Sequence, residues 1–267
     1  MSEAQKKAYI LADNRLALDA TWDEEVLRLE IESLKDLEFD ISLTGFEDFE
    51  IGDLTTGDAE TAEDNFDVAA EMEKPCVAKL GDVWTLDKHK IICGDSTLPE
   101  TYQKLLGDRK VNLICTDPPY FVNIKNESGT IANDDLNDAD GYEFLKKVFD
   151  NFKVAMAIDA SIYMFYASVK GRIFHDAFED AGFKVGAGLV WKKDHLVLTR
   201  ANDLVLDGFL GSASTLIACE KLGRVCYGIE IEPKFIDVAV ERYAAFAGSR
   251  ENIFVLREGK NIPLTEI

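Results

Sequence analysis

An acid, two prolines and an aromatic ring follow an apolar run in the stretch LICTDPPYFVN, residues 113–123. Proline fixes φ and has no N–H, so Asp117-Pro118-Pro119-Tyr120 is predicted to form a stiff bend at the end of a strand. Such a bend can hold the Asp117 carboxylate and nearby backbone carbonyls as hydrogen-bond acceptors, with the Tyr120 ring beside them. That arrangement suits a neutral planar amine, such as the exocyclic nitrogen of adenine or cytosine. Reaching this nitrogen inside a duplex requires the base to be flipped out.

A second stretch with residues suited to ligand binding is DGFLGSAS, residues 207–214. A glycine-bearing turn between a strand and a helix lets the backbone approach a ligand closely and points the helix N–H groups at it. The following strand ends at Glu230, about 20 residues further on, where an acidic side chain can accept hydrogen bonds from ribose hydroxyls. Ligands of such sheets bind outside the carboxyl ends of the strands, so both stretches are expected to face one crevice.

For both stretches, interpretations that involve no ligand binding or catalysis remain open. The Asp117 stretch could be a plain Pro-Pro turn, although an acid at the end of a buried strand needs a partner. The second stretch could be a strand–turn–helix with a stray glycine, and Glu230 could be a surface residue. Neither stretch decides the function on its own.

The elements that must position these residues alternate between strand and helix from about residue 76 onward. This alternation indicates an α/β fold with a mostly parallel sheet and helices on both faces. Gly182 is a helix stop signal, and Pro233 suits a first helical turn. Strands are predicted at 89–95, 111–117, 160–168 (fully buried), 183–193, 203–207 and 225–232, and helices at 141–156, 172–182, 215–223 and 233–248.

The acidity of the chain is concentrated before this domain. Residues 1–75 hold 22 Asp and Glu against 6 Lys and Arg, whereas residues 76–267 hold 28 against 23. This near balance leaves nucleic-acid binding open for the larger part. Residues 8–38 have a helical pattern, and Glu47–Glu73 contains eleven acids and no basic residue, as a solvated linker would. The predicted organisation is a helical segment at 1–46, an acidic linker at 47–75 and one domain at 76–267.

The five cysteines form no C-x-x-C pair and no metal-like spacing with the three histidines. We interpret them as reduced thiols of a cytoplasmic protein and expect no metal. The N-terminus lacks the apolar core of a signal peptide, and no run of about 18 apolar residues predicts a membrane span. His89, His175 and His195 are predicted to lie on the surface or on helix faces. Trp84 is predicted to pack in the core.

The TDPPY motif after an apolar strand, together with the later block DLVLDGFLGSASTLIACEKLGRVCYGIEIEPKFIDVAVERY, resembles the DNA amino-methyltransferases that use S-adenosylmethionine. The order of the two motifs is that of the permuted subgroup called β, and the resemblance covers roughly Lys79–Gly248. It implies a Rossmann-like methyltransferase sheet. The segment AYILADNRLALDATWDEEVLRLEIESL is similar to the C-terminal part of ParB-like domains, which are fused to such methylases in phage and prophage genes.

The resemblance implies a role for each matching residue. Asp117 and the backbone of Pro118 and Pro119 would accept hydrogen bonds from the target amine, and Tyr120 would stack on the base of the DNA substrate. Methyl transfer would be direct and in line, from S-adenosylmethionine to adenine N6 or cytosine N4, with Asp before the prolines leaning toward adenine. The residues that would bind the cofactor are Asp207, Phe209, Gly211 and Ser212 at its methionine end, Glu230 at its ribose and Asp95 at its adenine.

The chain departs from the family pattern in two places. The family's cofactor turn reads D-P-F-G-G-S-G, whereas here Gly208, Leu210 and Ala213 stand at the second, fourth and seventh positions. Strain of about 1–2 kcal/mol is expected wherever such a residue needs a left-handed backbone. The family's target-recognition region is also missing, because the domain is shortened between residues 194 and 203.

Three hypotheses therefore stand. The first is a site-specific DNA amino-methyltransferase. The second is a catalytically impaired prophage remnant that acts through binding alone, with a protein partner for the acidic N-terminal segment. The third and weakest is methylation of a protein amide, which uses a related Pro-Pro-Tyr motif but with Asn first and the cofactor motif earlier in the chain.

Overall fold

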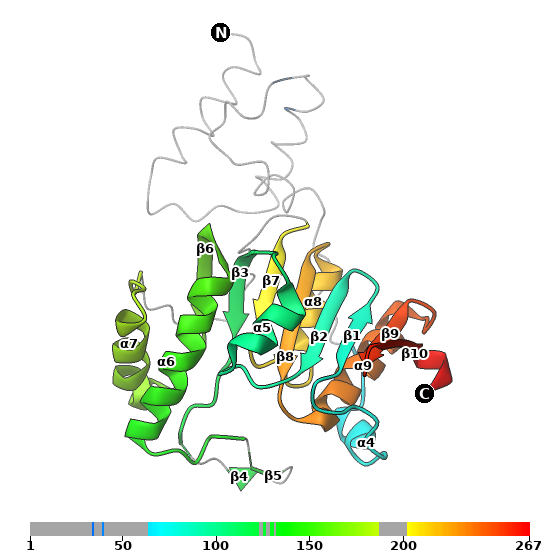
Figure 1. Ribbon diagram of the computed structural model, residues 1–267, viewed down its shortest axis with the longest axis horizontal. Helices are drawn as coiled ribbons and strands as arrows, with labels where there is room; N and C mark the ends of the chain where they lie inside the picture. Colours follow the sequence, from blue (N-terminus) through cyan, green and yellow to red (C-terminus); the bar gives the residue numbers. More distant parts are fainter. Residues whose placement is uncertain are drawn as a thin grey trace. The chain divides into compact units, whose positions relative to one another are not determined.

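An eight-stranded mixed sheet forms the centre of the computed structural model, which describes Leu34, Phe39 and residues 64–122, 125–126, 129–130, 132–186 and 202–267 (Figure 1). The strands are Val83–Leu86 (β1), His89–Cys93 (β2), Val111–Thr116 (β3), Met156–Met164 (β6), Leu204–Asp207 (β7), Val225–Glu230 (β8), Ile253–Arg257 (β9) and Lys260–Pro263 (β10), with a separate ribbon of Lys125–Asn126 (β4) and Gly129–Thr130 (β5). The order in the sheet is β10-β9-β1-β2-β8-β7-β3-β6. All neighbours from β2 to β6 run parallel, and the others run antiparallel.

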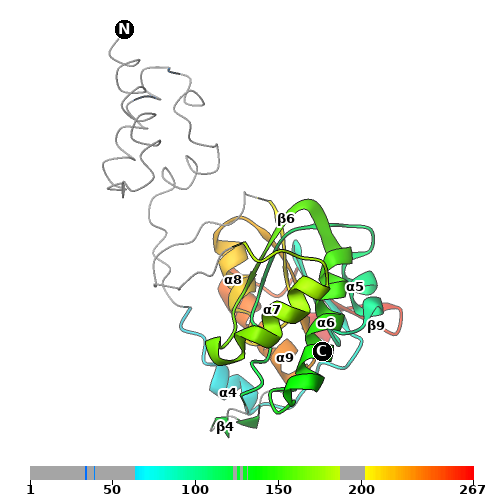
Figure 2. The same cartoon turned by 90° about the vertical axis from the view of Figure 1, so that its left-hand side faces the viewer.

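Helices cover both faces of this sheet. They are Val68–Met72 (α4), Pro99–Leu106 (α5), Asp138–Ala155 (α6), Gly171–Asp180 (α7), Ser214–Lys221 (α8) and Pro233–Ala247 (α9), with 3₁₀ turns at Ser168–Lys170 and Leu264–Glu266. Figures 1 and 2 show α5 and α6 on one face and α8 and α9 on the opposite face, while α7 packs beside α6. The predicted α/β class, a mostly parallel sheet with helices on both faces, is confirmed. No helix in the described part of the chain is long and apolar enough to cross a membrane.

Helix α6, which follows the Asp117 bend, begins at Asp138, ahead of its predicted start at residue 141, and Asn137 is its N-cap. The Asn137 side chain accepts hydrogen bonds from the backbone N–H groups of Ala139 and Asp140 at 3.0 and 3.1 Å, which satisfies two N–H groups of the first turn. Apolar residues at three- and four-residue spacing form one side of the helix and are fully buried in the core between helix and sheet. These are Leu145, Val148, Phe149 and Phe152.

Of the stretch predicted at 160–168 as a fully buried strand, residues 160–164 form the end of β6, which is the last strand of the sheet in the described part of the chain. Within the described residues β6 pairs with β3 alone, and its register shifts between the pairs Val111–Met156 and Leu113–Ser161. The shift leaves Ile158 fully exposed. The apolar run predicted burial on both faces, but every residue of β6 keeps part of its surface exposed, because burial requires elements packed on both faces. Of the strand predicted at 183–193, residues 183–186 form no strand, and the remainder lies outside the described residues.

Residues 64–75 of the predicted acidic linker are described by the structure. The structural unit that carries the sheet begins at Asp64, and α4 packs against α9. Both carboxylate oxygens of the buried Asp237 on α9 accept backbone hydrogen bonds, from the N–H groups of Val77 and Ala78, at 2.8 Å each. These contacts fix residues 64–78 to the sheet, because leaving a buried carboxylate without partners is costly. The predicted boundaries before Asp64 lie outside the described residues.

His89 is buried in β2, contrary to the prediction that it lies on the surface. Its Nε2 is 2.6 Å from Oε2 of Glu220 on α8, and its Nδ1 accepts a hydrogen bond from the backbone N–H of Cys226 at 2.8 Å. Burial lowers the pKa of His89 from 6.5, and the hydrogen bond to Glu220 opposes that shift. A protonated Nδ1 could not accept from Cys226, so the contact also favours the neutral ring. His175 is exposed on α7, and His195 lies outside the described residues.

The lowered pKa of His89 predicts a pH dependence of stability. Below pH 6.5 the unfolded chain binds a proton at this histidine that the folded chain does not, so the free energy of unfolding falls as the pH is lowered. In urea titrations between about pH 5.5 and 7.5, the His89→Gln variant should lose a positive slope of up to about 1.4 kcal/mol per pH unit. His175→Gln is the matched control and should keep the wild-type slope. Equal slopes for all three proteins would contradict the prediction.

Candidate active site

The two stretches singled out from the sequence lie at the ends of neighbouring parallel strands. β3 pairs with β7 through Leu113–Val205 and Ile114–Leu206, so Thr116 and Asp207 end side by side. The Thr116 hydroxyl donates a hydrogen bond to Oδ1 of Asp207 at 2.8 Å and accepts one from the backbone N–H of Gly208 at 3.1 Å. The Asp117 bend and the glycine turn are therefore joined at the carboxyl edge of the sheet.

A third strand end belongs to the same buried network. Ser96, which follows β2, donates its hydroxyl proton to the carbonyl oxygen of Gly208. The backbone carbonyl of Ser96 accepts hydrogen bonds from the Tyr102 hydroxyl at 2.9 Å and the Asn151 side chain at 3.1 Å. Ser96 and Thr116 are 5% and 2% exposed. Neither residue was assigned a role from the sequence, although Thr116 opens the TDPPY motif and Ser96 directly follows Asp95.

The residues of the Asp117 bend differ in their exposure to solvent. Pro118 and Pro119 are buried, Tyr120 is half-buried and the Asp117 side chain is exposed. Neighbouring protein atoms exclude water from part of the carboxylate and raise the pKa of Asp117, while a hydrogen bond from the Tyr120 hydroxyl acts in the opposite direction. Desolvation and the same contact raise the pKa of Tyr120, which therefore stays a phenol. A carboxylate open to solvent beside an aromatic ring can receive a planar amine.

Phe121 locks this bend against α6 and was not recognised from the sequence. Its φ of 59° lies in the left-handed region, which is rare for a bulky residue and costs about 1–3 kcal/mol. The Phe121 ring is 4% exposed and lies 5.8 and 6.1 Å from the ring centres of Phe174 and Phe144. A Cβ on Gly141 would come within 3.0 Å of this ring, so the absence of a side chain there makes room for it. Gly141 is the signal in the sequence that could have indicated this contact.

The glycine turn is held by carboxylates. Oδ1 of the buried Asp207 accepts from the backbone N–H of Phe209 at 3.0 Å, and Oδ2 accepts from the Thr215 hydroxyl at 2.7 Å. Glu230 at the end of β8 accepts from the N–H of Gly211 at 2.7 Å. Burial raises the pKa of both Asp207 and Glu230, and these hydrogen bonds counteract the shift. The acids fix the shape of the turn and leave Glu230 half-buried at its rim.

The three residues that depart from the family's turn differ in what their side chains contact and in their backbone conformation. A Cβ on Gly208 would lie 2.9 Å from the Phe152 ring, so a side chain there would force Phe152 to shift. Leu210 does not take a positive φ; its side chain is buried and rests on Gly228, where a Cβ would come within 2.8 Å of it. Ala213 has a φ of 68° and is fully buried, so the expected left-handed strain applies at this position but not at Leu210.

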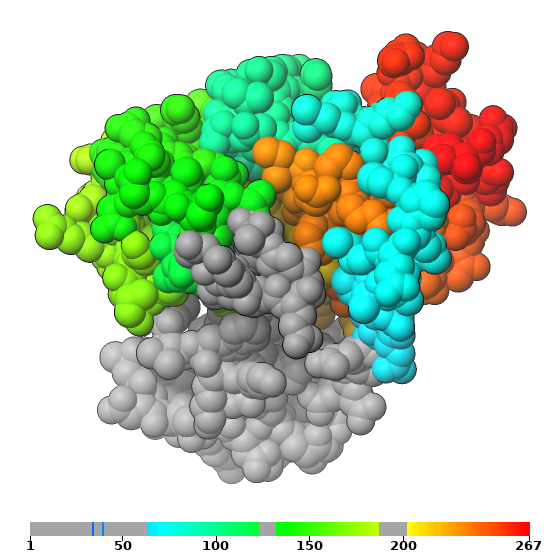
Figure 3. All heavy atoms as spheres, turned by 90° about the horizontal axis from the view of Figure 1, so that it is seen from below, coloured from blue at the N-terminus to red at the C-terminus, as the bar shows by residue number. Residues whose placement is uncertain are grey.

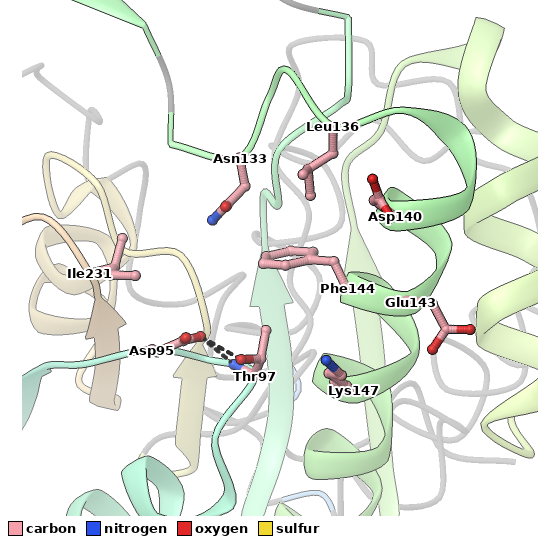
Figure 4. A pocket seen from close by; sticks show the side chains of 9 residues that line it. All are labelled: Asp95, Thr97, Asn133, Leu136, Asp140, Glu143, Phe144, Lys147 and Ile231. Atoms are coloured by element: carbon pink, nitrogen blue, oxygen red, sulfur yellow. Dashed lines mark hydrogen bonds between the residues drawn. The ribbon is translucent and has the colours of Figure 1, made fainter.

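An open pocket of about 340 Å³ lies beside these strand ends (Figure 4). Asp95 lines it from the end of β2, with Oδ1 accepting from the backbone N–H and the hydroxyl of Thr97 at 2.8 Å each. Ile231, directly after Glu230, lies on the same side as Asp95, and the Phe144 ring from α6 points into the middle. Phe144 also lies 6.0 Å from the ring of Phe209. The remaining lining residues are Asn133, Leu136, Asp140, Glu143 and Lys147.

The pocket combines apolar and hydrogen-bonding groups, as small-molecule sites do. Its volume is at the lower end of the range for small-molecule sites, and apolar walls from Ile231 and Phe144 alternate with the Asp95 acceptor. The structure brings Asp95 to the pocket wall and Glu230 to the position next to Ile231. Phe209 meets the pocket through Phe144, while Gly211 bonds to Glu230. Asp207 is 4% exposed, so it shapes the turn from below rather than facing the pocket.

Two segments of the chain match family models. Residues 25–80 match the ParB-methyltransferase HTH domain, and residues 196–241 match the DNA methylase model for N6 and N4 methylation. The resemblance to DNA methylases joined to a ParB-like segment, indicated by the sequence, is confirmed by these matches. The first match extends to residue 80 and so crosses the segment 47–75 that was predicted as a linker.

Individual relatives cover different shares of the chain. The Type II methyltransferase M.Cfr9I of Citrobacter freundii is 40% identical over 47 residues, which are 18% of this chain and 16% of that protein. The match therefore spans about a sixth of that relative. Among solved structures, M1.HpyAVI is 20% identical over 57% of this chain and 97% of its own, with a TM-score of 0.42. The cytosine-N4-specific PvuII DNA methyltransferase is 14% identical over 59% and 87%, with a TM-score of 0.43.

The Thr116 hydroxyl should be essential to the junction of the two strand ends. Thr116→Val keeps the shape of the side chain but leaves the N–H of Gly208 without its acceptor and removes one donor from Asp207. We expect the free energy of unfolding in urea to fall by about 1–3 kcal/mol. Thr85→Val, at a half-buried position of β1, is the matched control and should cost less than about 0.5 kcal/mol. Equal stabilities of the two variants would show that the junction contributes nothing.

Proposed function

We propose, with the DNA methylase match over residues 196–241 as the premise, that this chain methylates the exocyclic amine of a DNA base, adenine N6 or cytosine N4. The observation that carries the proposal is the contact between Thr116 and Asp207, which joins the Asp117 bend to the glycine turn on neighbouring strands. The bend that would bind the amine and the turn that would bind the cofactor therefore lie at the same edge of the sheet. Proximity of this kind is the main requirement of a direct group transfer.

The Asp117 bend would bind the amine. The ionised carboxylate and the backbone carbonyls of the bend accept the hydrogens of the amino group, which leaves the nitrogen lone pair directed away from them. Tyr120 donates its hydroxyl proton to Asp117 and offers its ring to the base. Flipping the base out of the duplex would bring it to the exposed carboxylate. Asp at position 117 leans toward adenine as the preferred base.

Bound S-adenosylmethionine would supply an activated methyl group on a positively charged sulfur. In this chain Asp95, Ile231 and Glu230 would hold its nucleoside part, because they surround the pocket or border it. The backbone of Phe209–Ser212 would hold its methionine part. Each of these residues would bind or orient the cofactor. The methyl–sulfur bond would break as the methyl–nitrogen bond forms, and the surplus proton on the amine would pass to the exposed Asp117 carboxylate and from there to water.

The thiol nearest the bend does not support a covalent route. Cys115 precedes Thr116 on β3, and burial raises the pKa of its thiol to about 12. A nucleophilic cysteine needs a lowered pKa, so this thiol stays protonated at neutral pH. Direct transfer to nitrogen is therefore the chemistry that these residues favour.

A binding role without catalysis is the second candidate, and the left-handed Ala213 favours it. Strain in the turn would weaken cofactor binding if the turn relaxes to another shape. In that case the acidic segment before Asp64, which opposes contact with phosphates, would bind a protein partner. Methylation of a protein amide is a weaker candidate. Every described contact that would support it supports the DNA reaction equally well.

Labelled methyl transfer tests the proposal. Wild-type protein with S-adenosylmethionine and mixed-sequence duplex DNA should label the DNA, and nuclease digestion followed by mass spectrometry should identify N6-methyladenine or N4-methylcytosine. Asp117→Ala should lower the rate by at least about 100-fold, because the amine loses its main acceptor. Asp159→Ala removes an exposed carboxylate on β6 and should leave the rate unchanged.

The two candidates give opposite results. DNA that carries no label above the Asp117→Ala background would reject the catalytic proposal. Weak or absent binding of S-adenosylmethionine by calorimetry would then favour the binding role, and tight binding would count against it. Label found on a protein substrate in place of DNA would reject both.

A further inference from the structure

Arg242 on α9 bridges the start of the structural unit and the glycine turn. Its Nε and Nη2 donate to the two carboxylate oxygens of Asp64 at 2.6 and 2.7 Å. Its Nη1 donates to the carbonyl oxygen of Ser212 at 2.7 Å, with the hydroxyl oxygens of Ser212 and Ser214 at 3.5 and 3.3 Å. One guanidinium thus holds an acid that precedes α4 and a backbone carbonyl of the turn.

The geometry of this bridge is that of a strong interaction. Both side chains are largely buried, with 14% of Arg242 and 13% of Asp64 exposed. The fork of the guanidinium matches both carboxylate oxygens, an arrangement that fixes orientation as well as distance. Figure 3, which looks at the carboxyl edge of the strands, shows the cyan segment that contains α4 lying along the orange α9. Partial burial makes this pair less sensitive to salt than an exposed one.

The turn needs support at the position where Arg242 binds it. Ser212 precedes Ala213, whose φ of 68° costs energy for a residue with a Cβ. No described side chain caps the first turn of α8, which begins at Ser214. A donor on the Ser212 carbonyl favours the one orientation of that peptide seen here. The strained turn is therefore held from outside by Arg242.

We propose that Arg242 is a positioning residue for the glycine turn and that Asp64 keeps it in place. The segment that supplies Asp64 thereby sets the shape of the turn, without touching the pocket itself. The consequence for cofactor affinity rests on the proposed methyltransferase function, whereas the consequence for the turn does not. Loss of the Asp64 carboxylate frees the guanidinium to rotate toward solvent and leaves the Ser212 carbonyl without a fixed donor.

Hydrogen exchange of the full-length protein, without cofactor, tests the effect on the turn. In Asp64→Asn and Arg242→Gln, the backbone amides of residues 209–214 should exchange about 10-fold faster than in the wild type, while amides of β2 and β8 should not change. Arg242→Lys keeps the charge but not the fork, so it should resemble Arg242→Gln. Arg250→Gln is the matched control, because Arg250 pairs with Glu241 of α9 at a more exposed site. The double variant of Asp64 and Arg242 should exchange like the single variants, because both remove one bridge.

Calorimetry with S-adenosylmethionine then measures the consequence for binding. Kd should rise about 5- to 10-fold in Asp64→Asn and stay unchanged in Arg250→Gln. Two results would overturn the proposal. If the exchange rates of amides 209–214 in the variants equal those of the wild type, the pair does not affect the turn. If they rise by the same factor as the rates of all other amides, the pair is only a general stabiliser. A wild-type protein that binds no S-adenosylmethionine would reject the proposed function alone, because the exchange experiment still decides whether Arg242 positions the turn.

Discussion

A buried hydrogen bond between Thr116 and Asp207 is the constraint on which the site depends. Asp207 is almost fully buried, and a carboxylate in that position is tolerated only if its oxygens are satisfied. Thr116, Thr215 and the N–H of Phe209 satisfy them. Asp207 ends β7, and its donors come from β3, α8 and the turn, so these four elements cannot separate without leaving a buried charge unpaired. The Asp117 bend thereby keeps a fixed place relative to the glycine turn.

Much of this arrangement could be predicted because the signals are local. Alternating apolar strands and amphipathic helices indicated most elements from β2 to α9, but not α5, β4 or β5. Parallel strands necessarily bring the residues after their carboxyl ends to one edge. The position of Asp117 at a strand end followed from the two prolines. The antiparallel strands β1, β9 and β10 were not predicted, since each is short and carries no clear period.

The errors arise where a contact joins residues far apart in the chain. His89 was placed on the surface because nothing near it in the sequence suggested a partner, but Glu220 lies 131 residues further on. β6 was predicted as buried because an apolar run does not say whether elements pack on both faces of a strand. The glycine turn shows the same limit. Leu210 fits because Gly228 on the next strand has no side chain, and a side chain in place of Gly208 would force Phe152 on α6 to shift.

The acidic composition acquires a structural meaning at Asp64. A run of acids without bases predicts a solvated segment, yet Asp64 pairs with Arg242 and Glu71 with Lys74. The Lys74 pair is mostly open to solvent on the lysine side and stabilises little, whereas the Arg242 pair is buried and forked. Removing an acid that neutralises a buried guanidinium costs more than removing a solvated one. Charge in the last part of the acidic segment is therefore tied to the turn that faces the candidate active site, and composition alone could not distinguish that acid from its solvated neighbours.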